Sequence, residues 1–355
     1  GVATLVGPIL GGVLIDGPGW EWIFFVNVPV GVVGLVLAAR LVPALETHAH
    51  GIDWVGVALS AIGLLCGIFA IQEGETYDWG TIRGIVSVPL LLAVGAVMLV
   101  AFVWWQSRVR SEPLVPLRLF LDRNFSVSNV AITTMSFAVT ATMFPLMLWA
   151  QAVRGYDPTH AALLLAPQAV MSIVLARPVG ALVDRLHPRA LPSIGLLGFA
   201  LVLLAFWRLM TPTSPVWAIL LLAVAMGACG SLIWGPLAAS ANRNLPVELA
   251  GAGSGVYNTT RQIGAVLGSA AITALMQNRL AAHLPASGQG VVTGPGGAIP
   301  PAVREGFSRA LAESVLLPTA ALLVGFAATL LFEQARHLRD ASDAGVAPAA
   351  GEATA

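Results

Sequence analysis

Ten apolar stretches, most close to twenty residues long, follow one another along nearly the whole chain. Each is long enough to cross roughly 30 Å of hydrocarbon as an α-helix. Helices are expected rather than barrel strands, because apolar runs of this length satisfy their own backbone hydrogen bonds in lipid. The sequence predicts an all-α polytopic membrane protein with about ten transmembrane helices, which cover residues 1–15, 22–42, 53–72, 84–106, 125–150, 159–179, 190–210, 214–237, 250–276 and 311–332.

The charge content agrees with this prediction. Only 10% of the residues are charged, against about 25% in soluble domains. The formal net charge is zero, so no basic field indicates a nucleic-acid partner. Cys66 and Cys229 both lie inside apolar runs, where we interpret them as buried small side chains. The six histidines are scattered in or next to loops, so we expect neither a metal site, nor an organic cofactor, nor an enzyme.

The arginines predict the orientation, because cytoplasmic loops carry an excess of basic residues. One side of the membrane receives Arg40, Arg108, Arg110, Arg118, Arg123, Arg177, Arg185, Arg189, Arg243, Arg336 and Arg339. The other side receives Arg83, Arg154, Arg208, Arg279, Arg304 and Arg309. We therefore expect a multi-pass protein of the cell membrane whose C-terminus is cytoplasmic.

Three polar residues in the ninth apolar stretch share a helix face. Asn258, Arg261 and Gln262 are spaced i, i+3 and i+4. Arg261 lies eleven residues into that stretch, or about 16 Å deep at 1.5 Å per residue. A charge at that depth must face a wet cavity or a partner. The alternative is a structural arginine that binds carbonyl groups or extends toward the inner interface.

Further candidates for a substrate cavity are polar or polarisable side chains that lipid does not favour. Methionine and aromatic side chains suit varied apolar substrates, because they repack readily. The alternative interpretation is ordinary core packing, and it applies most strongly to Met143 and Trp234. The complete set of candidates is Asn129, Met143, Gln168, Trp234, Asn258, Arg261 and Gln262.

Two glycine-containing motifs predict a bend and a latch. In GPILGG, Pro8 removes a helix hydrogen bond, and the glycines allow a second helix to approach closely. The candidates for this bend are Gly7, Pro8, Gly11 and Gly12. In GALVDRLHPR a charged turn joins two spans, and its candidates for an inner latch are Gly180, Asp184, Arg185 and Arg189. The alternatives are a bent helix without further role and a simple cytoplasmic anchor.

Together these stretches resemble the major facilitator superfamily, in particular its fourteen-helix drug:proton antiporter branch (EmrB/QacA-like). GPILGG resembles the antiporter motif of the fifth helix, and WEWIFFVNVPVG resembles the entry to the sixth. EPLVPLRLFLDRNF, GALVDRLHPR and GSGVYNTTRQIGAVLGSA resemble the loop before the ninth helix, the second inner-loop motif and the thirteenth helix. Two positions depart from the family pattern: Ala3 and His187 stand where the family usually has glycine.

The resemblance implies that the first four helices, and with them the proton-carrying acid, precede Gly1. It assigns residues 1–42 to the end of the N-terminal half and 43–123 to an extra helix pair with an amphipathic cytoplasmic linker. It assigns 124–333 to the six-helix C-terminal half and 334–355 to a disordered cytoplasmic tail. Related halves would pack about a central cavity near the membrane midplane.

The function that the resemblance implies is export of drugs or other amphipathic small molecules by proton antiport with alternating access. The proton gradient would supply the energy, and we expect a monomer in the lipid bilayer, with no adaptor partner indicated. Two alternatives stay open: an exporter dedicated to one endogenous metabolite, such as an antibiotic or siderophore, and a non-transporting fragment.

Overall fold

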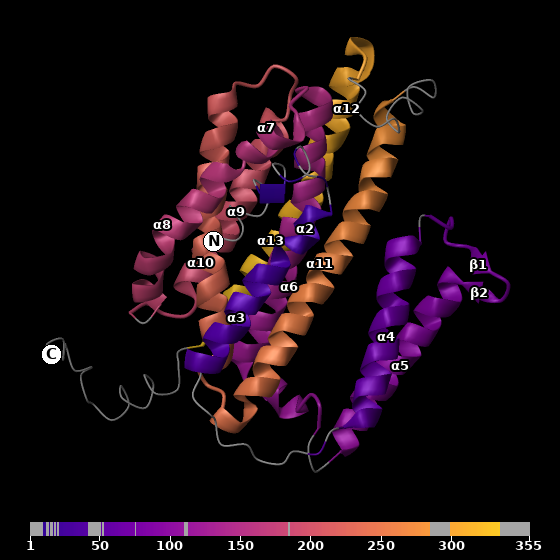
Figure 1. Ribbon diagram of the computed structural model, residues 1–355, viewed down its shortest axis with the longest axis vertical. Coiled ribbons are helices and arrows are strands. Elements are labelled where there is room, and N and C mark those ends of the chain that lie inside the picture. Colours follow the sequence, from indigo (N-terminus) through magenta and orange to yellow (C-terminus); the bar gives the residue numbers. More distant parts are fainter. Residues whose placement is uncertain are drawn as a thin grey trace, which may run out of the picture.

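The computed structural model describes residues 10–11, 14, 17, 19, 21–41, 51, 53–74, 76–109, 113–183, 185–284 and 299–333. In this part the chain is almost entirely helical, with one short antiparallel strand pair (Figure 1). The elements are α2 (Trp22–Phe25), α3 (Asn27–Leu41), α4 (Trp54–Glu73), β1 (Thr81–Arg83), β2 (Val86–Ser87), α5 (Val88–Arg108), η1 (Leu117–Leu121), α6 (Arg123–Leu148), η2 (Trp149–Val153), α7 (Pro158–Leu163), α8 (Ala166–Val183), α9 (Ala190–Leu209), α10 (Val216–Asn242), α11 (Val247–His283), α12 (Pro301–Ser314) and α13 (Leu316–Thr329).

Eight helical segments of the described part are long and apolar enough to cross a membrane, and they coincide with eight of the ten predicted spans. Two starts differ from the prediction. The span predicted at 84–106 begins at Val88, because the preceding residues pair as β1 and β2. The span predicted at 311–332 begins at Ala302, because α12 runs almost directly into α13. Of the predicted span 1–15, only residues 10, 11 and 14 are described.

The predicted span 250–276 lies inside α11, which extends from Val247 to His283 and has 37 residues. It is not one of the eight apolar segments, because its mixed composition lowers the hydropathy of every window. At 1.5 Å per residue α11 is about 55 Å long, well beyond the roughly 30 Å of hydrocarbon. Figure 1 shows it running obliquely across the whole height of the molecule.

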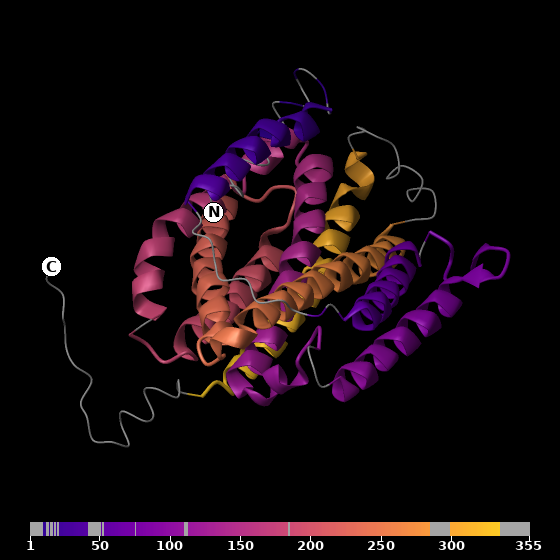
Figure 2. The same cartoon turned by 60° about the horizontal axis from the view of Figure 1, so that its bottom comes forward.

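Helices α6 and α8–α13 form one bundle, in which α6 is central. Helix α6 packs against α11 and α13, while α10 packs against α8 and α9, and α9 also packs against α13. Figures 1 and 2 show α8, α9 and α10 on one side of α6 and α11 on the other. The three helices α6, α8 and α9 therefore repeat, in their contacts, the arrangement of α10, α11 and α13. Two triplets packed in this reciprocal way are typical of transporters with internal repeats.

Glycines produce the closest helix contacts of the bundle at matching places. A Cβ atom on Gly264 would lie 2.3 Å from the Thr133 carbonyl oxygen of α6, and one on Gly268 would lie 2.4 Å from the Phe137 carbonyl oxygen. In the other pair, a Cβ atom on Gly227 of α10 would overlap the Gln168 carbonyl of α8. Small residues allow this approach in lipid, where packing rather than hydrophobic burial drives helix association.

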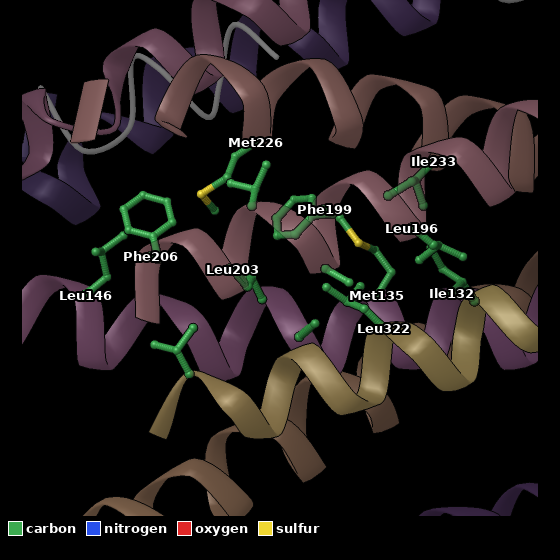
Figure 3. Packing of buried hydrophobic residues seen from close by; sticks show 14 of the residues in the cluster. Ile132, Met135, Leu146, Leu196, Phe199, Leu203, Phe206, Met226, Ile233 and Leu322 are labelled. Carbon is green, nitrogen blue, oxygen red and sulfur yellow. The ribbon is translucent and has the colours of Figure 1, made fainter. Parts of the chain in front are cut away.

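Large apolar side chains fill the space between α6, α9, α10 and α13 (Figure 3). Met135 of α6 and Phe199 of α9 are almost completely buried, and Leu322 of α13 meets the same cluster. Met226 and Ile233 contribute from α10. This cluster holds the described bundle together independently of the residues outside the described ranges.

Helices α4 and α5 form a separate hairpin beside α11 (Figures 1 and 2). A Cβ atom on Gly95 of α5 would lie 2.9 Å from the Gly67 nitrogen of α4, so the two backbones are in close contact. At the other end, the Asp53 carboxylate accepts hydrogen bonds from the Gly56 N–H, from Trp105 Nε1 and from Gln106 Nε2. The carboxylate of Asp53 therefore joins the beginning of α4 to the end of α5.

Replacing Asp53 with alanine is expected to loosen this end of the hairpin. Burial raises the pKa of Asp53, but the three hydrogen bonds outweigh it and hold the pKa below the ordinary 3.8. The folded hairpin thus binds the deprotonated form better. This stabilisation is complete above the ordinary pKa and is lost as the pH falls through the lowered value. Loss of a helix cap alone costs about 1 kcal/mol.

The measurement is thermal unfolding of the purified protein in detergent. Ser87→Ala is the matched control, because Ser87 caps α5 through one hydrogen bond to the Leu90 N–H and joins no second helix. The apparent Tm should fall more for Asp53→Ala than for Ser87→Ala. Equal shifts would contradict a role of Asp53 beyond simple capping.

Candidate functional site

One face of α11 carries the polar residues that the sequence analysis singled out. Gly264 of α11 lies against α6, whereas Asn258 and Gln262 are exposed on the described part of the molecule. The Asn258 amide donates a hydrogen bond to the Ser254 carbonyl, 3.0 Å away, one turn earlier in the same helix. The α6–α11 packing therefore leaves the side chains of Asn258 and Gln262 outside the bundle core.

Arg261 is half-buried at the edge of this face and lies near Trp234 of α10. The guanidinium carbon of Arg261 lies 6.0 Å from the centre of the Trp234 ring, which is the outer limit of a cation–π contact. Arg261 lies fourteen residues after the first residue of α11, or about 21 Å along its axis. No acidic side chain pairs with it in the described ranges. The structure thus brings together two of the predicted candidates, a charge and an aromatic ring from neighbouring helices.

Tyr257 also belongs to this neighbourhood, although the sequence analysis did not select it. It lies one turn before Arg261, its side chain is only 7% exposed, and its hydroxyl has no hydrogen-bond partner among the described residues. A buried hydroxyl without a partner is costly in an apolar environment. The i, i+4 spacing from Arg261 is the signal that would have identified Tyr257 from the sequence.

Asn129 occupies a different place. Its side chain is buried between α6 and α11, where its Nδ2 donates to the Phe125 carbonyl and its Oδ1 accepts from the Thr260 hydroxyl at 2.7 Å. The Thr133 hydroxyl makes a further bond across the same helix pair, to the Thr260 carbonyl. Asn129 therefore uses its polar groups to join two helices of the bundle.

Gln168 and Met143 lie apart from Arg261. The backbone of Gln168 lies against Gly227 at the α8–α10 contact, and its carbonyl accepts from the Ser172 hydroxyl. The side chain of Gln168 is half-buried. Met143 lies near the other end of α6 and is exposed on the described part of the molecule. Neither side chain makes a printed polar or ring contact with Arg261 or Trp234 in the described ranges.

The two glycine-containing motifs are described only in part. Of the antiporter-motif candidates, Gly11 is helical and half-buried with open space around it, while Gly7, Pro8 and Gly12 lie outside the described residues.

The inner-loop turn carries three described candidates. Gly180, Arg185 and Arg189 are exposed, and Asp184 lies outside the described residues. The Arg189 N–H donates to the ring nitrogen Nδ1 of His187, which replaces the glycine of the family pattern. Desolvation lowers the pKa of His187, and the positive charge of Arg189 lowers it further. His187 is therefore neutral at pH 7, when it can accept that hydrogen bond.

Charged residues gather at the opposite end of the bundle. Glu313 of α12 lies 3.4 Å from Arg279 Nη1 and 3.2 Å from His283 Nε2, both on α11. A cleft of about 790 Å³ opens beside it, between the end of α9 and α12, with Arg208 and Arg309 in its walls. In the described part of the chain, no group of three or more histidine, cysteine or acidic side chains is arranged to hold a metal ion.

Comparison with known proteins accounts for this architecture. Residues 1–269 match the family model described as Major Facilitator Superfamily. The chain is 47% identical to the uncharacterized MFS-type transporter Rv1250 of Mycobacterium tuberculosis, over 93% of this chain and 57% of that protein. It is 30% identical to the multidrug export protein EmrB of Escherichia coli, over 79% of this chain and 55% of EmrB.

A third relative is the tetracenomycin C resistance and export protein of Streptomyces glaucescens, at 30% identity over 79% of this chain and 51% of that protein. The chain spans about half the length of the relatives it matches. Family model, relatives and multi-pass helical fold agree with one another. The chain therefore belongs to the major facilitator superfamily of membrane transporters.

Proposed function

We propose that the protein exports amphipathic small molecules across the cell membrane by alternating access, with inward proton flow as the source of energy. The observation that carries this proposal is the position of Arg261. Its guanidinium lies near the middle of a long membrane helix, beside the ring of Trp234 and without an acidic partner in the described ranges. A charge at such depth is stable only where water or a polar ligand reaches it.

The composition of the face favours amphipathic substrates. Asn258 and Gln262 offer hydrogen-bond donors and acceptors, Trp234 offers an aromatic surface, and Arg261 offers a positive charge. An apolar surface with a few convergent polar groups is the usual composition of a small-molecule site. In the proposed cycle, Gly7, Pro8, Gly11 and Gly12 form the bend that controls closure, with the C-terminus in the cytoplasm. Asp184, Arg185 and Arg189, beside Gly180, form the inner latch.

The test is transport by the full-length protein in proteoliposomes. A pH gradient is imposed across the membrane, and movement of a fluorescent organic cation such as ethidium is followed. We expect transport against the dye gradient that stops when a protonophore collapses the pH gradient. Dye movement equal to that of protein-free liposomes would overturn the export proposal, and export that survives the protonophore would overturn its proton coupling.

A second candidate is export of one endogenous metabolite. The similarity to the tetracenomycin C resistance and export protein favours it, since that name states a single antibiotic. A competition panel separates the two functions. Several structurally unrelated compounds should each inhibit dye export by a broad exporter, whereas a dedicated exporter should respond to one chemical scaffold only.

A further inference from the structure

A second cleft, of about 600 Å³, lies between the α4–α5 hairpin and the bundle, away from the Arg261 face. Its walls come from the last turn of α4, from the turn that follows it, from the middle of α6 and from the second half of α11 (Figure 1). The lining residues are Ile71, Gln72, Glu73, Trp79, Phe137, Leu267, Ser269, Ala270, Ala271, Thr273 and Ala274.

The floor of this cleft is apolar. Phe137, Leu267 and the alanines of α11 present only hydrocarbon surface. The two hydroxyl groups are already engaged in their own helix, because Ser269 donates to the Val266 carbonyl and Thr273 donates to the Ser269 carbonyl. Phe137 lies halfway along α6, so the floor reaches toward the middle of the membrane span. A hydrocarbon chain is the group that such a floor accommodates best.

The rim is different, because it holds a carboxylate without a partner. Glu73 is the only charged side chain among the described lining residues, and no hydrogen bond or ion pair engages its carboxylate in the described part of the chain. Glu73 is also the last residue of α4. The C-terminal end of a helix is the negative end of its dipole, where a carboxylate is disfavoured and a cation is stabilised. Both effects favour a positively charged ligand at this rim.

Trp79 places the rim at the depth of lipid headgroups. Tryptophan is enriched at the membrane–water interface, and the Trp79 side chain is 48% exposed here. Its ring lies on Gly74, where an added Cβ atom would approach it to 2.9 Å. Its backbone has a φ of 55°, which is uncommon for a bulky residue. The turn after α4 thus adopts a strained conformation that holds an aromatic ring beside Glu73.

We propose that this cleft binds an aminophospholipid, whose ammonium group pairs with Glu73 and whose acyl chain lies on the floor between α4 and α11. A primary ammonium can donate hydrogen bonds to the carboxylate and to the amide oxygen of Gln72. A choline headgroup lacks such donors, and an anionic headgroup is repelled. The inference goes beyond the proposed export function, because it assigns a binding site outside the Arg261 face and needs no transport step.

The test is native mass spectrometry of the full-length protein, titrated with phosphatidylethanolamine, phosphatidylcholine and phosphatidylglycerol of identical chains. We expect phosphatidylethanolamine to be retained preferentially. Glu73→Gln should weaken its retention roughly tenfold, because a hydrogen bond to a charged group is lost. Ala274→Phe should weaken retention of all three lipids, because it fills the floor without touching the rim charge.

Asp78→Asn is the matched control. Asp78 lies in the same turn and outside the cleft lining, and its φ of 47° is one that asparagine adopts readily. Equal retention of the three headgroups, or equal effects of Glu73→Gln and Asp78→Asn, would overturn the proposal. So would Glu73-dependent binding of tetraphenylphosphonium with no lipid preference. Dye export by Glu73→Gln is measured in parallel, so that failure of the lipid site is distinguished from failure of the export function.

Discussion

Replacing Arg261 with alanine is expected to abolish dye export while the protein still folds and inserts into the membrane. Arg261 is the only charged residue of α11 between Glu248 and Arg279, so its removal leaves the polar face without a charge. The loss of a desolvated cation–π contact is worth about 2 kcal/mol. The bundle does not depend on it, because the buried cluster around Phe199 and the glycine contacts with α6 stay intact.

Two further variants separate the charge of Arg261 from its shape. Arg261→Lys keeps the positive charge but loses the planar group that stacks on Trp234, so we expect partial export. Arg309→Ala is the matched control, because Arg309 is exposed on α12 and pairs only with Glu305 in its own helix. Export, membrane content and apparent Tm are measured for each variant. Export by Arg261→Ala at the unmodified rate would refute the role of this face.

Replacing Gly264 with alanine is expected to destabilise the bundle strongly. Alanine is the better helix former by about 1 kcal/mol, so helix propensity alone predicts a more stable protein. The structure predicts the opposite sign, because the new Cβ atom would lie 2.3 Å from the Thr133 carbonyl oxygen. That atom belongs to the backbone of α6, so the two helices must separate. Overpacking of this kind costs typically about 1–3 kcal/mol.

Gly255 of the same helix provides the control. No atom lies within 4 Å of a Cβ atom built there in the described structure, so Gly255→Ala should leave the apparent Tm unchanged or raise it. Gly227→Ala should resemble Gly264→Ala, because Gly227 lies equally close to the Gln168 carbonyl in the matching helix pair. A higher Tm for Gly264→Ala than for Gly255→Ala would show that α6 and α11 do not pack as described.

The membrane spans could be predicted from hydropathy because the signal is local. A run of about twenty apolar residues determines a spanning helix whatever its neighbours are. Where the prediction missed a boundary, a local pairing outside the hydropathy signal decided it, as with β1 and β2 before α5. Helix α11 was predicted too short, because hydropathy does not register helical turns that continue into water or along a polar face.

The candidate site was only partly predictable, because a side chain's role depends on the helix it faces. Asn129 and Asn258 are the same residue type in similar apolar surroundings. Asn129 bonds to Thr260 across a buried helix contact, whereas Asn258 is exposed and bonds within its own helix. Nothing in the sequence separates the two, since they lie more than a hundred residues apart and the distinction arises from which way each helix is rotated.

The sequence by itself determined that this protein is built from apolar membrane helices and which polar residues share the face of α11. Helical periodicity and the cost of polar groups in lipid act within a single segment, so no partner is needed to infer them. Only the tertiary structure decided that Arg261 meets Trp234 and that Gly264 closes on Thr133. It alone decided that Glu73 borders a cleft with α11. These contacts join segments far apart in the chain, and their geometry is set by how closely small residues let the helices approach.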